Sequence, residues 1–211
     1  MYYLDHGQYS QALAAAARST TVNDTPPSAL NVLGVTEMMT GSPALALASF
    51  NRALALDASL TAARLNRGVA LMQLHRNDEA VTDFASVYAG DPALRAPAAY
   101  QRALAEEQLD NLEGALLWLN RALQADPGLT EAIFYRGIIE ERRGNFQEAG
   151  RDYKTFLQLH PESAAAMLRF GIAAQRSGHA DTARRYFQQV LDTDPFGAEA
   201  VEARKFMVMW D

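Results

Sequence analysis

Residues 144–161, GNFQEAGRDYKTFLQLHP, decide the fold because three other parts of the chain repeat their pattern. The related stretches are GSPALALASFNRALALD (41–57), DNLEGALLWLNRALQADP (110–127) and GHADTARRYFQQVLDTDP (178–195). Each starts with small or polar residues, continues with an alanine and has an aromatic residue or leucine four positions later. Residues four apart share one face of an α-helix. The pattern therefore predicts an amphipathic helix that recurs along the chain.

The recurrence has a nearly constant step. Pro92, Pro127, Pro161 and Pro195 lie 35, 34 and 34 residues apart. Small residues keep the same step in two series, which are Ala46, Ala80, Ala115, Ala149 and Ala183, and Gly34, Gly68, Ala103, Gly137 and Gly171. Facing small residues let two helices pack closely, and a proline cannot continue the second helix. The expected structure is a stack of helix pairs in which each pair buries its apolar face against its neighbours.

A helix–turn–helix unit of 34 residues with these small residues resembles the tetratricopeptide repeat (TPR) family, and the resemblance covers nearly the whole chain. It implies an all-α fold, a right-handed superhelical solenoid of antiparallel helix pairs. We expect one solenoid domain, in which large residues such as Phe50, Phe84 and Leu119 fill the space between repeats. Its expected parts are a partial repeat and linker at 1–26, five full repeats at 27–60, 61–95, 96–129, 130–163 and 164–197, and a capping helix at 198–211.

Composition argues against several classes of function. The 211 residues carry 19 basic and 25 acidic side chains, a net charge of −6, whereas sequence-independent nucleic-acid binding needs a basic surface. No stretch has the roughly 20 apolar residues of a membrane span, so direct membrane insertion is not expected. No targeting segment is recognised, and the location stays open between cytoplasm and periplasm. Basic charge carried mostly by arginine, with abundant alanine, suggests a bacterial source.

No catalytic or metal-binding pattern is present in the sequence. The chain has no cysteine, and His6, His75, His160 and His179 lie in or beside predicted turns of separate repeats. Histidine pairs with metal-ligand spacing and glycine-rich phosphate-binding motifs do not occur. We therefore expect no enzyme activity, no cofactor and no metal site.

The TPR resemblance implies a protein-binding module whose first helices line a concave groove. The side chains expected to face a partner are Asn31, Val35, Met38, Met39, Leu65, Asn66, Val69, Met72, Tyr100, Gln101, Leu104, Phe134, Tyr135, Ile138, Arg142, Arg169 and Arg176. Methionine and aromatic side chains suit apolar partner residues. Amides such as Asn31, Asn66 and Gln101 suit hydrogen bonds to a peptide backbone. The three arginines would favour an acidic segment at the C-terminal end.

Two structural alternatives stay open at this point. The apolar groove residues either face a partner or pack between adjacent first helices. Arg67, Arg102 and Arg136, which recur at the repeat spacing, either bind anions or lie along the helix with their charged ends at solvent or neighbouring acids.

The expected function is that of an adaptor or scaffold that binds a peptide or helix of a partner protein during assembly of a larger complex. One alternative is a self-associating scaffold, with a homo-oligomer formed through the apolar segment Phe206–Trp210. Another is a TPR fragment of a longer protein, such as a cell-envelope assembly or secretion component.

Overall fold

The computed structural model describes residues 25–208, and this part of the chain is entirely helical and without strands. The chain divides into two compact units, with the boundary between Ala125 and Asp126. The first unit contains α2 (Pro27–Met39), α3 (Pro43–Leu56), α4 (Thr61–Gln73), α5 (Asn77–Gly90), the 3-10 turn η1 (Pro92–Leu94), α6 (Arg95–Gln108) and α7 (Leu112–Ala125). The second contains α8 (Thr130–Arg142), α9 (Phe146–Leu159), α10 (Ala164–Arg176), α11 (Ala180–Thr193) and α12 (Ala198–Met207).

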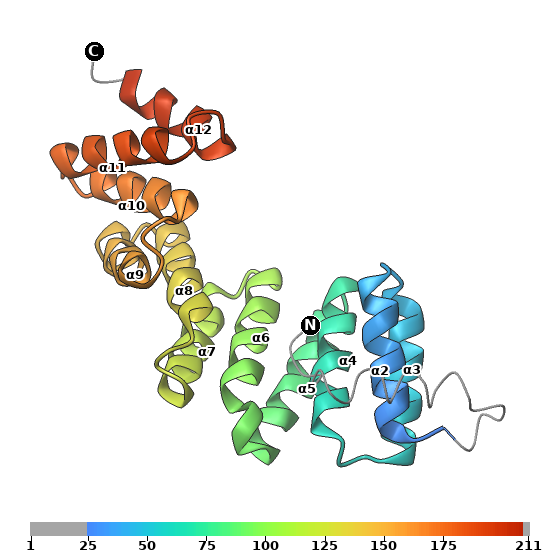
Figure 1. Ribbon diagram of the computed structural model, residues 1–211. Coiled ribbons are helices and arrows are strands. Elements are labelled where there is room, and N and C mark those ends of the chain that lie inside the picture. The colour runs from blue at the N-terminus through green and yellow to red at the C-terminus, as the bar shows by residue number, and fades with distance from the viewer. Residues whose placement is uncertain (1–24, 209–211) are drawn as a thin grey trace. The chain divides into compact units, whose positions relative to one another are not determined.

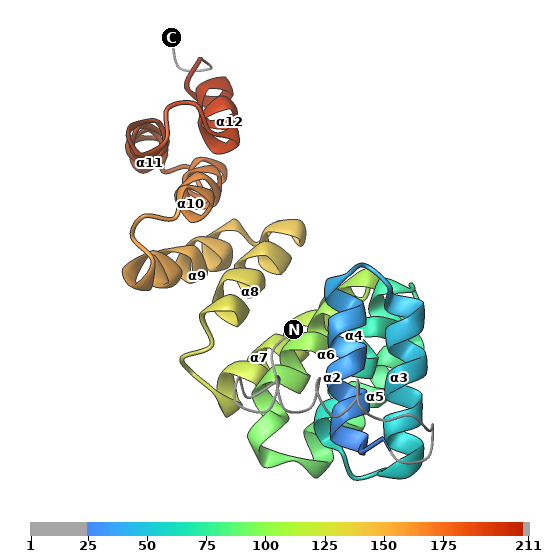
Figure 2. The ribbon, with the colours of Figure 1, turned by 45° about the vertical axis from the view of Figure 1, so that its right-hand side comes forward.

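Within each unit, consecutive helices pack as pairs and each pair stacks on the next (Figures 1 and 2). The pairs are α2–α3, α4–α5 and α6–α7 in the first unit, and α8–α9 and α10–α11 in the second, with α12 packed on α10 and α11. The all-α, helix-pair fold is therefore confirmed. The exact repeat boundaries and the single solenoid domain stay predictions, and residues 1–24 of the expected partial repeat lie outside the described part of the chain.

The two helices of a pair approach where a glycine of the first helix lies over a ring of the second. A methyl group added at Gly68 would lie 2.4 Å from the ring of Phe84, a distance that real contacts do not reach. The same arrangement joins Gly34 to Phe50, Gly137 to Tyr153 and Gly171 to Phe187. The sequence placed these rings between repeats. The structure places each ring under the glycine of its own pair, and the glycine is needed because the ring occupies the space of a side chain.

The turn inside each pair contains one residue with left-handed backbone conformation. Glycine occupies this position three times, with φ of 74° at Gly41, 80° at Gly144 and 84° at Gly178. His75 and Asp110 adopt the same conformation with φ of 59°. Left-handed φ costs little for glycine and more for other residues, so the recurring turn explains why glycine follows the first helix in three of five pairs.

The helices are 13 or 14 residues long except for α12, which has 10. No described helix is both long enough and apolar enough to cross a membrane.

Candidate protein-binding site

The face expected to bind a partner belongs to the first helix of each pair, α2, α4 and α6 in the first unit and α8 and α10 in the second. Its side chains differ widely in exposure. In the first unit Val35, Leu65 and Met72 are 5%, 1% and 7% exposed and belong to the apolar core. Their position decides the alternative left open by the sequence, because these three side chains pack inside the unit and offer a partner almost no surface.

The two asparagines of this face bind each other. The Asn66 side-chain amide donates to the Asn31 side-chain oxygen at 3.0 Å, and both residues are buried. A buried amide pair with this geometry holds α4 against α2 and would be costly to open. One N–H of Asn66 and the side-chain oxygen of Asn31 are therefore used inside the unit, and the expected hydrogen bonds from these two residues to a partner backbone stay a prediction.

Other members of the face remain accessible. Met39 is 56% exposed, while Met38 and Val69 are half-buried. Further along, Tyr100, Gln101 and Leu104 of α6 are half-buried as well. These six side chains form the accessible part of the predicted site in the first unit, and they combine apolar surface with a side-chain amide.

A small cavity opens between α2 and α4 on this face. Its volume is about 60 Å³, and its walls are Val35, Met38, Phe50, Asn66, Val69 and Gln73. Gln73, at the end of α4, is exposed. Water in the liquid occupies about 30 Å³ per molecule, so the cavity has room for a small apolar group. Gln73 was not among the residues predicted from sequence, although it lies one residue after Met72.

In the second unit the aromatic member of the face belongs to the interior. The ring of Phe134 packs against Tyr153 and Phe156, with centroids 5.6 Å and 4.8 Å apart. Tyr135 and Ile138 of the same helix are half-buried. Phe134 is therefore a packing residue of the α8–α9 pair with only part of its surface available to a partner.

The arginines expected to attract an acidic segment have partners within the second unit. Arg169 donates to the Glu141 carboxylate at 3.1 Å, and the Tyr153 hydroxyl donates to the same oxygen at 2.6 Å. Burial, together with the hydrogen bond to Glu141, raises the pKa of Tyr153 far above its ordinary value. Arg176 lies over the Phe146 ring, 4.7 Å from its centroid, and Arg142 is exposed at the end of α8. The positive charge expected at this end is therefore largely compensated at Arg169.

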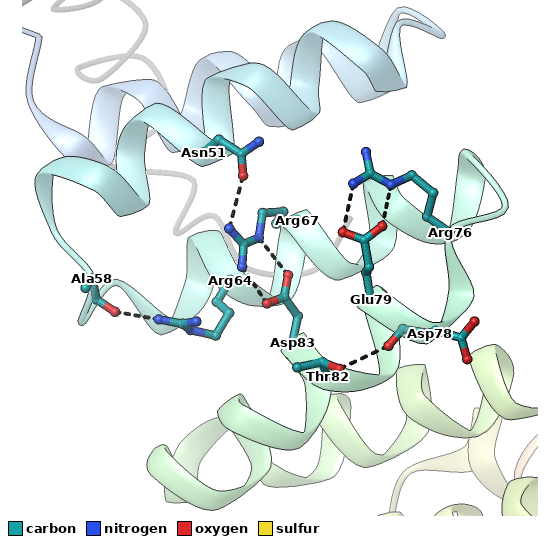
Figure 3. A network of polar contacts seen from close by, with 9 residues as sticks. All are labelled: Asn51, Ala58, Arg64, Arg67, Arg76, Asp78, Glu79, Thr82 and Asp83. Atoms are coloured by element: carbon teal, nitrogen blue, oxygen red, sulfur yellow. Dashed lines mark hydrogen bonds and ion pairs between the residues drawn. The ribbon is translucent and has the colours of Figure 1, made fainter.

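The arginine series at the repeat spacing pairs with residues sixteen positions later, on the second helix. Arg67 and Asp83 form a bidentate ion pair at 2.6 Å and 2.7 Å, and Arg67 also donates to Asn51 of α3 at 3.0 Å (Figure 3). Arg136 binds Asp152 in the same way, and the guanidinium of Arg102 lies over the Trp118 ring at 4.0 Å.

These contacts show why the series recurs, and they leave no ladder of open anion sites. The aspartates and Trp118 were missed from sequence. The constant separation of sixteen residues was the signal that could have revealed them.

Metal binding finds no support in the described residues, where no group of three or more His, Asp or Glu side chains is placed to hold an ion. Of the described histidines, His75 is exposed in the turn after α4.

Stacked antiparallel helix pairs with a repeat of about 34 residues define this protein as a helical repeat protein. One family model described as Tetratricopeptide repeat matches residues 1–60 and 65–130, and a second model with the same description matches residues 142–204. The chain belongs to the tetratricopeptide repeat family, whose members are generally protein–protein interaction modules and not enzymes. No curated protein sequence matches the chain.

Solved structures share the fold at low sequence identity. The Pseudomonas aeruginosa protein pilF has a TM-score of 0.78 at 20% identity, with 96% of this chain and 90% of that chain covered. MamA from Desulfovibrio magneticus RS-1 has a TM-score of 0.72 at 19% identity, with 82% and 97% covered. YrrB, described as a TPR protein with an unusual peptide-binding site, has a TM-score of 0.66 at 20% identity, with 93% and 97% covered. These similarities show the fold alone.

Proposed function

We propose that the chain is an adaptor that binds a peptide segment of a partner protein on the first-helix face of its first unit, within the assembly of a larger complex. The observation that carries the proposal is the cavity between α2 and α4, which is bordered by the accessible side chains of Met38, Val69 and Gln73. The concave groove that the TPR resemblance implies lies on the same helices. YrrB, a protein of this fold described as having a peptide-binding site, supports the same class of ligand.

The proposed ligand is an extended segment with one apolar side chain. Its apolar side chain enters the cavity beside Val69, and Met38 in the cavity wall packs against it, because methionine adapts to irregular apolar shapes. Gln73 and Gln101 hydrogen-bond the peptide backbone, a role that the sequence assigned to Gln101 together with the two asparagines. In the second unit, Tyr135, Ile138 and Arg142 remain candidate contacts on the corresponding face.

The test is selection of binding peptides from a displayed random library, followed by calorimetry of a selected peptide. Met38→Glu and Val69→Glu place a carboxylate in the cavity wall and should each weaken binding about tenfold or more. Leu45→Glu is the matched control, since Leu45 is 60% exposed on the second helix α3. Thermal unfolding checks that each variant stays folded. Unchanged affinity of both groove variants, or a loss confined to Leu45→Glu, would contradict the proposal.

A second candidate function is self-association near the C-terminal helix. Phe196, Val201 and Val208 are 92%, 51% and 72% exposed around α12, which leaves apolar surface for another copy. Part of the segment that the sequence singled out is used internally, because the Phe206 ring stacks on Phe187 with centroids 5.3 Å apart. Met209 and Trp210 lie outside the described residues.

A further inference from the structure

Gly150 of α9 occupies a repeat position where three other pairs carry a large apolar side chain. The residues at the equivalent positions are Leu47, Val81 and Leu116. Close packing does not require this glycine, because an added methyl group would first meet the Phe170 ring at an ordinary contact distance of 3.6 Å. A glycine inside a helix also lowers helix stability relative to other residues. A larger side chain would therefore fit at position 150, and packing does not explain why the residue there is glycine.

The missing side chain opens a groove between α9 and α11, with α10 as its floor. The groove has a volume of about 550 Å³. The equivalent groove in the first unit, between α3 and α5 over α4, has about 290 Å³. There, Leu47 and Leu71 line the groove. Arg67 and Asp83 also line it and form an ion pair with each other (Figure 3).

Each of these groups has a smaller or uncharged counterpart in the second unit. Gly150 occupies the position equivalent to Leu47, and Ala174 occupies the position equivalent to Leu71. Phe170 and Tyr186 occupy the positions equivalent to Arg67 and Asp83. Their rings meet edge to face with centroids 4.6 Å apart, in place of the ion pair. The result is a wider groove with an aromatic floor, whereas the narrower groove of the first unit is lined by leucines and an ion pair.

The chemistry of the wider groove combines an apolar floor with a basic rim. Phe146, Phe170 and Ala173 provide apolar surface, and Arg151 and Lys154 of α9 lie at the edge. Among the described residues, no carboxylate lines this groove. Glu148 pairs with Arg151 at 2.6 Å, but these side chains are 50% and 70% exposed, and ion pairs at such sites are weak and easily exchanged.

One polar atom at the end of the groove lacks a partner. The Ser177 hydroxyl oxygen is buried and makes no hydrogen bond within the described part of the chain. Leaving a buried hydroxyl unpaired is unfavourable, and a ligand that reached it would remove that cost. The groove thus offers one hydrogen-bonding group at its base in addition to the charges at its edge.

We propose that this groove is a second binding site, which takes an acidic peptide segment of a partner protein with one apolar side chain between its carboxylates. The apolar side chain fills the space that Gly150 leaves over Phe170, and the flanking carboxylates meet Lys154 and Arg151. A backbone group of the peptide pairs with the Ser177 hydroxyl. Charge complementarity selects this occupant, because the groove is basic on a chain whose net charge is −6. The site lies on a different unit from the cavity between α2 and α4, so the two proposals are independent.

The test uses the whole chain and fluorescein-labelled peptides, with binding followed by fluorescence anisotropy. The peptide Glu-Glu-Leu-Glu-Glu should bind saturably with a Kd below about 1 mM, and added salt should weaken it. The peptides Lys-Lys-Leu-Lys-Lys and Glu-Glu-Ser-Glu-Glu should bind about tenfold more weakly or not at all. No saturable binding of the first peptide, or equal binding of all three, would overturn the proposal.

Gly150→Leu separates binding from stability. The leucine restores the residue type of three other pairs and fills the groove, so binding should weaken about tenfold or more. The same change should raise the Tm by about 2–4 °C, because leucine favours the helix more than glycine does. Lys154→Glu should weaken binding to a similar extent by reversing the charge at the rim. Unchanged peptide affinity in Gly150→Leu would overturn the assignment of the groove.

Two kinds of control complete the experiment. Gly90→Ala changes another helix glycine whose added methyl group meets nothing within 4 Å, and it should leave peptide binding unchanged. Met38→Glu should also leave it unchanged, which distinguishes failure of this site from failure of the site between α2 and α4. A loss of peptide binding in these controls would overturn the peptide proposal. It would also be overturned if the chain formed a dimer that only Gly150→Leu converts to a monomer.

Discussion

Glycine and the ring beneath it vary together from one helix pair to the next. Four pairs combine a glycine of the first helix with Phe or Tyr of the second. The α6–α7 pair instead combines Ala103 with Leu119, and both are fully buried. The exchange keeps the space between the helices filled, since the added methyl group of alanine is matched by a smaller partner side chain. The five described helix pairs therefore contain two combinations, glycine with an aromatic ring and alanine with leucine.

A double-mutant cycle at Gly68 and Phe84 tests this coupling. Gly68→Ala alone should destabilise the fold by about 1–3 kcal/mol, because the methyl group would overlap the Phe84 ring. Adding Phe84→Leu should recover part of that loss, with a coupling free energy of about 0.5–3 kcal/mol. Urea unfolding of the two single variants and the double variant measures the coupling. Strictly additive effects would contradict the packing argument.

At the scale of the elements, a carboxylate recurs at the turns that follow the second helices. The side chains of Asp57, Asp91, Asp126 and Asp194 accept a hydrogen bond from the backbone N–H two residues later, at 2.9 Å, 3.0 Å, 2.9 Å and 3.2 Å. Such local bonds favour turns over continued helix. The aspartate after the second helix, which precedes proline in three of these four turns, thus ends the helix and starts the connection.

Asp91 also links two elements, because it accepts a hydrogen bond from the Thr61 hydroxyl of α4 at 2.6 Å. This bond, with the backbone N–H groups of Ala93 and Leu94, lowers the pKa of Asp91 below its ordinary value of 3.8. A lowered pKa in the folded state means that the ionised carboxylate stabilises the fold above the unfolded-state pKa. That contribution is lost as the pH falls from the ordinary pKa through the lower folded-state pKa.

Replacing Thr61 with valine should raise the pKa of Asp91 toward its ordinary value, because the largest cause of the lowered pKa is removed. Carbon-detected NMR titration of the Asp91 carboxyl group measures the change. Thr82→Val is the control, since the Thr82 hydroxyl donates to the backbone of Asp78 within α5. An unchanged Asp91 pKa in Thr61→Val would show that the hydrogen bond between α4 and the turn is not formed in solution.

At the scale of the whole molecule, the two compact units offer two different surfaces. The first unit carries the small cavity on its first-helix face, and the second carries the wide groove between α9 and α11. Function in repeat proteins resides in such surface residues and not in the shared scaffold. Two sites of different chemistry on one chain fit an adaptor that brings partner segments together.

The adaptor proposal predicts that the purified chain has the mass of one chain at all concentrations. Light scattering from micromolar to millimolar concentration measures this, because self-association makes the average mass rise with concentration. Phe196→Ser and Val208→Ser remove exposed apolar side chains near α12 and should leave the mass unchanged. A mass that rises with concentration, and falls back in these variants, would favour the self-associating scaffold instead.

The helix-pair fold and its period could be predicted from the sequence alone, and the resemblance to the TPR family added the expectation of a protein-binding module. Small residues, aspartates and prolines recur at a step of about 34 residues, because every repeat needs close packing of its two helices and a reversal of the chain. The identity of Gly68 and of Asp91 as repeat residues could be predicted for that reason. Their neighbours in space follow the same repeat and could be deduced in part, as the sixteen-residue separation of Arg67 and Asp83 shows.

Which residues of the first-helix face are accessible could not be predicted from the sequence and follows from how the helices pack. Val35, Leu65 and Met72 were expected at a partner and are buried, whereas Met39 is exposed. Successive residues on a helix differ by about 100° in direction, and the neighbouring helix determines which of them it covers. The Asn31–Asn66 pair and the open space at Gly150 likewise depend on contacts between different repeats. Periodicity within a repeat carries no information about those contacts, because they arise only when the helix pairs are stacked.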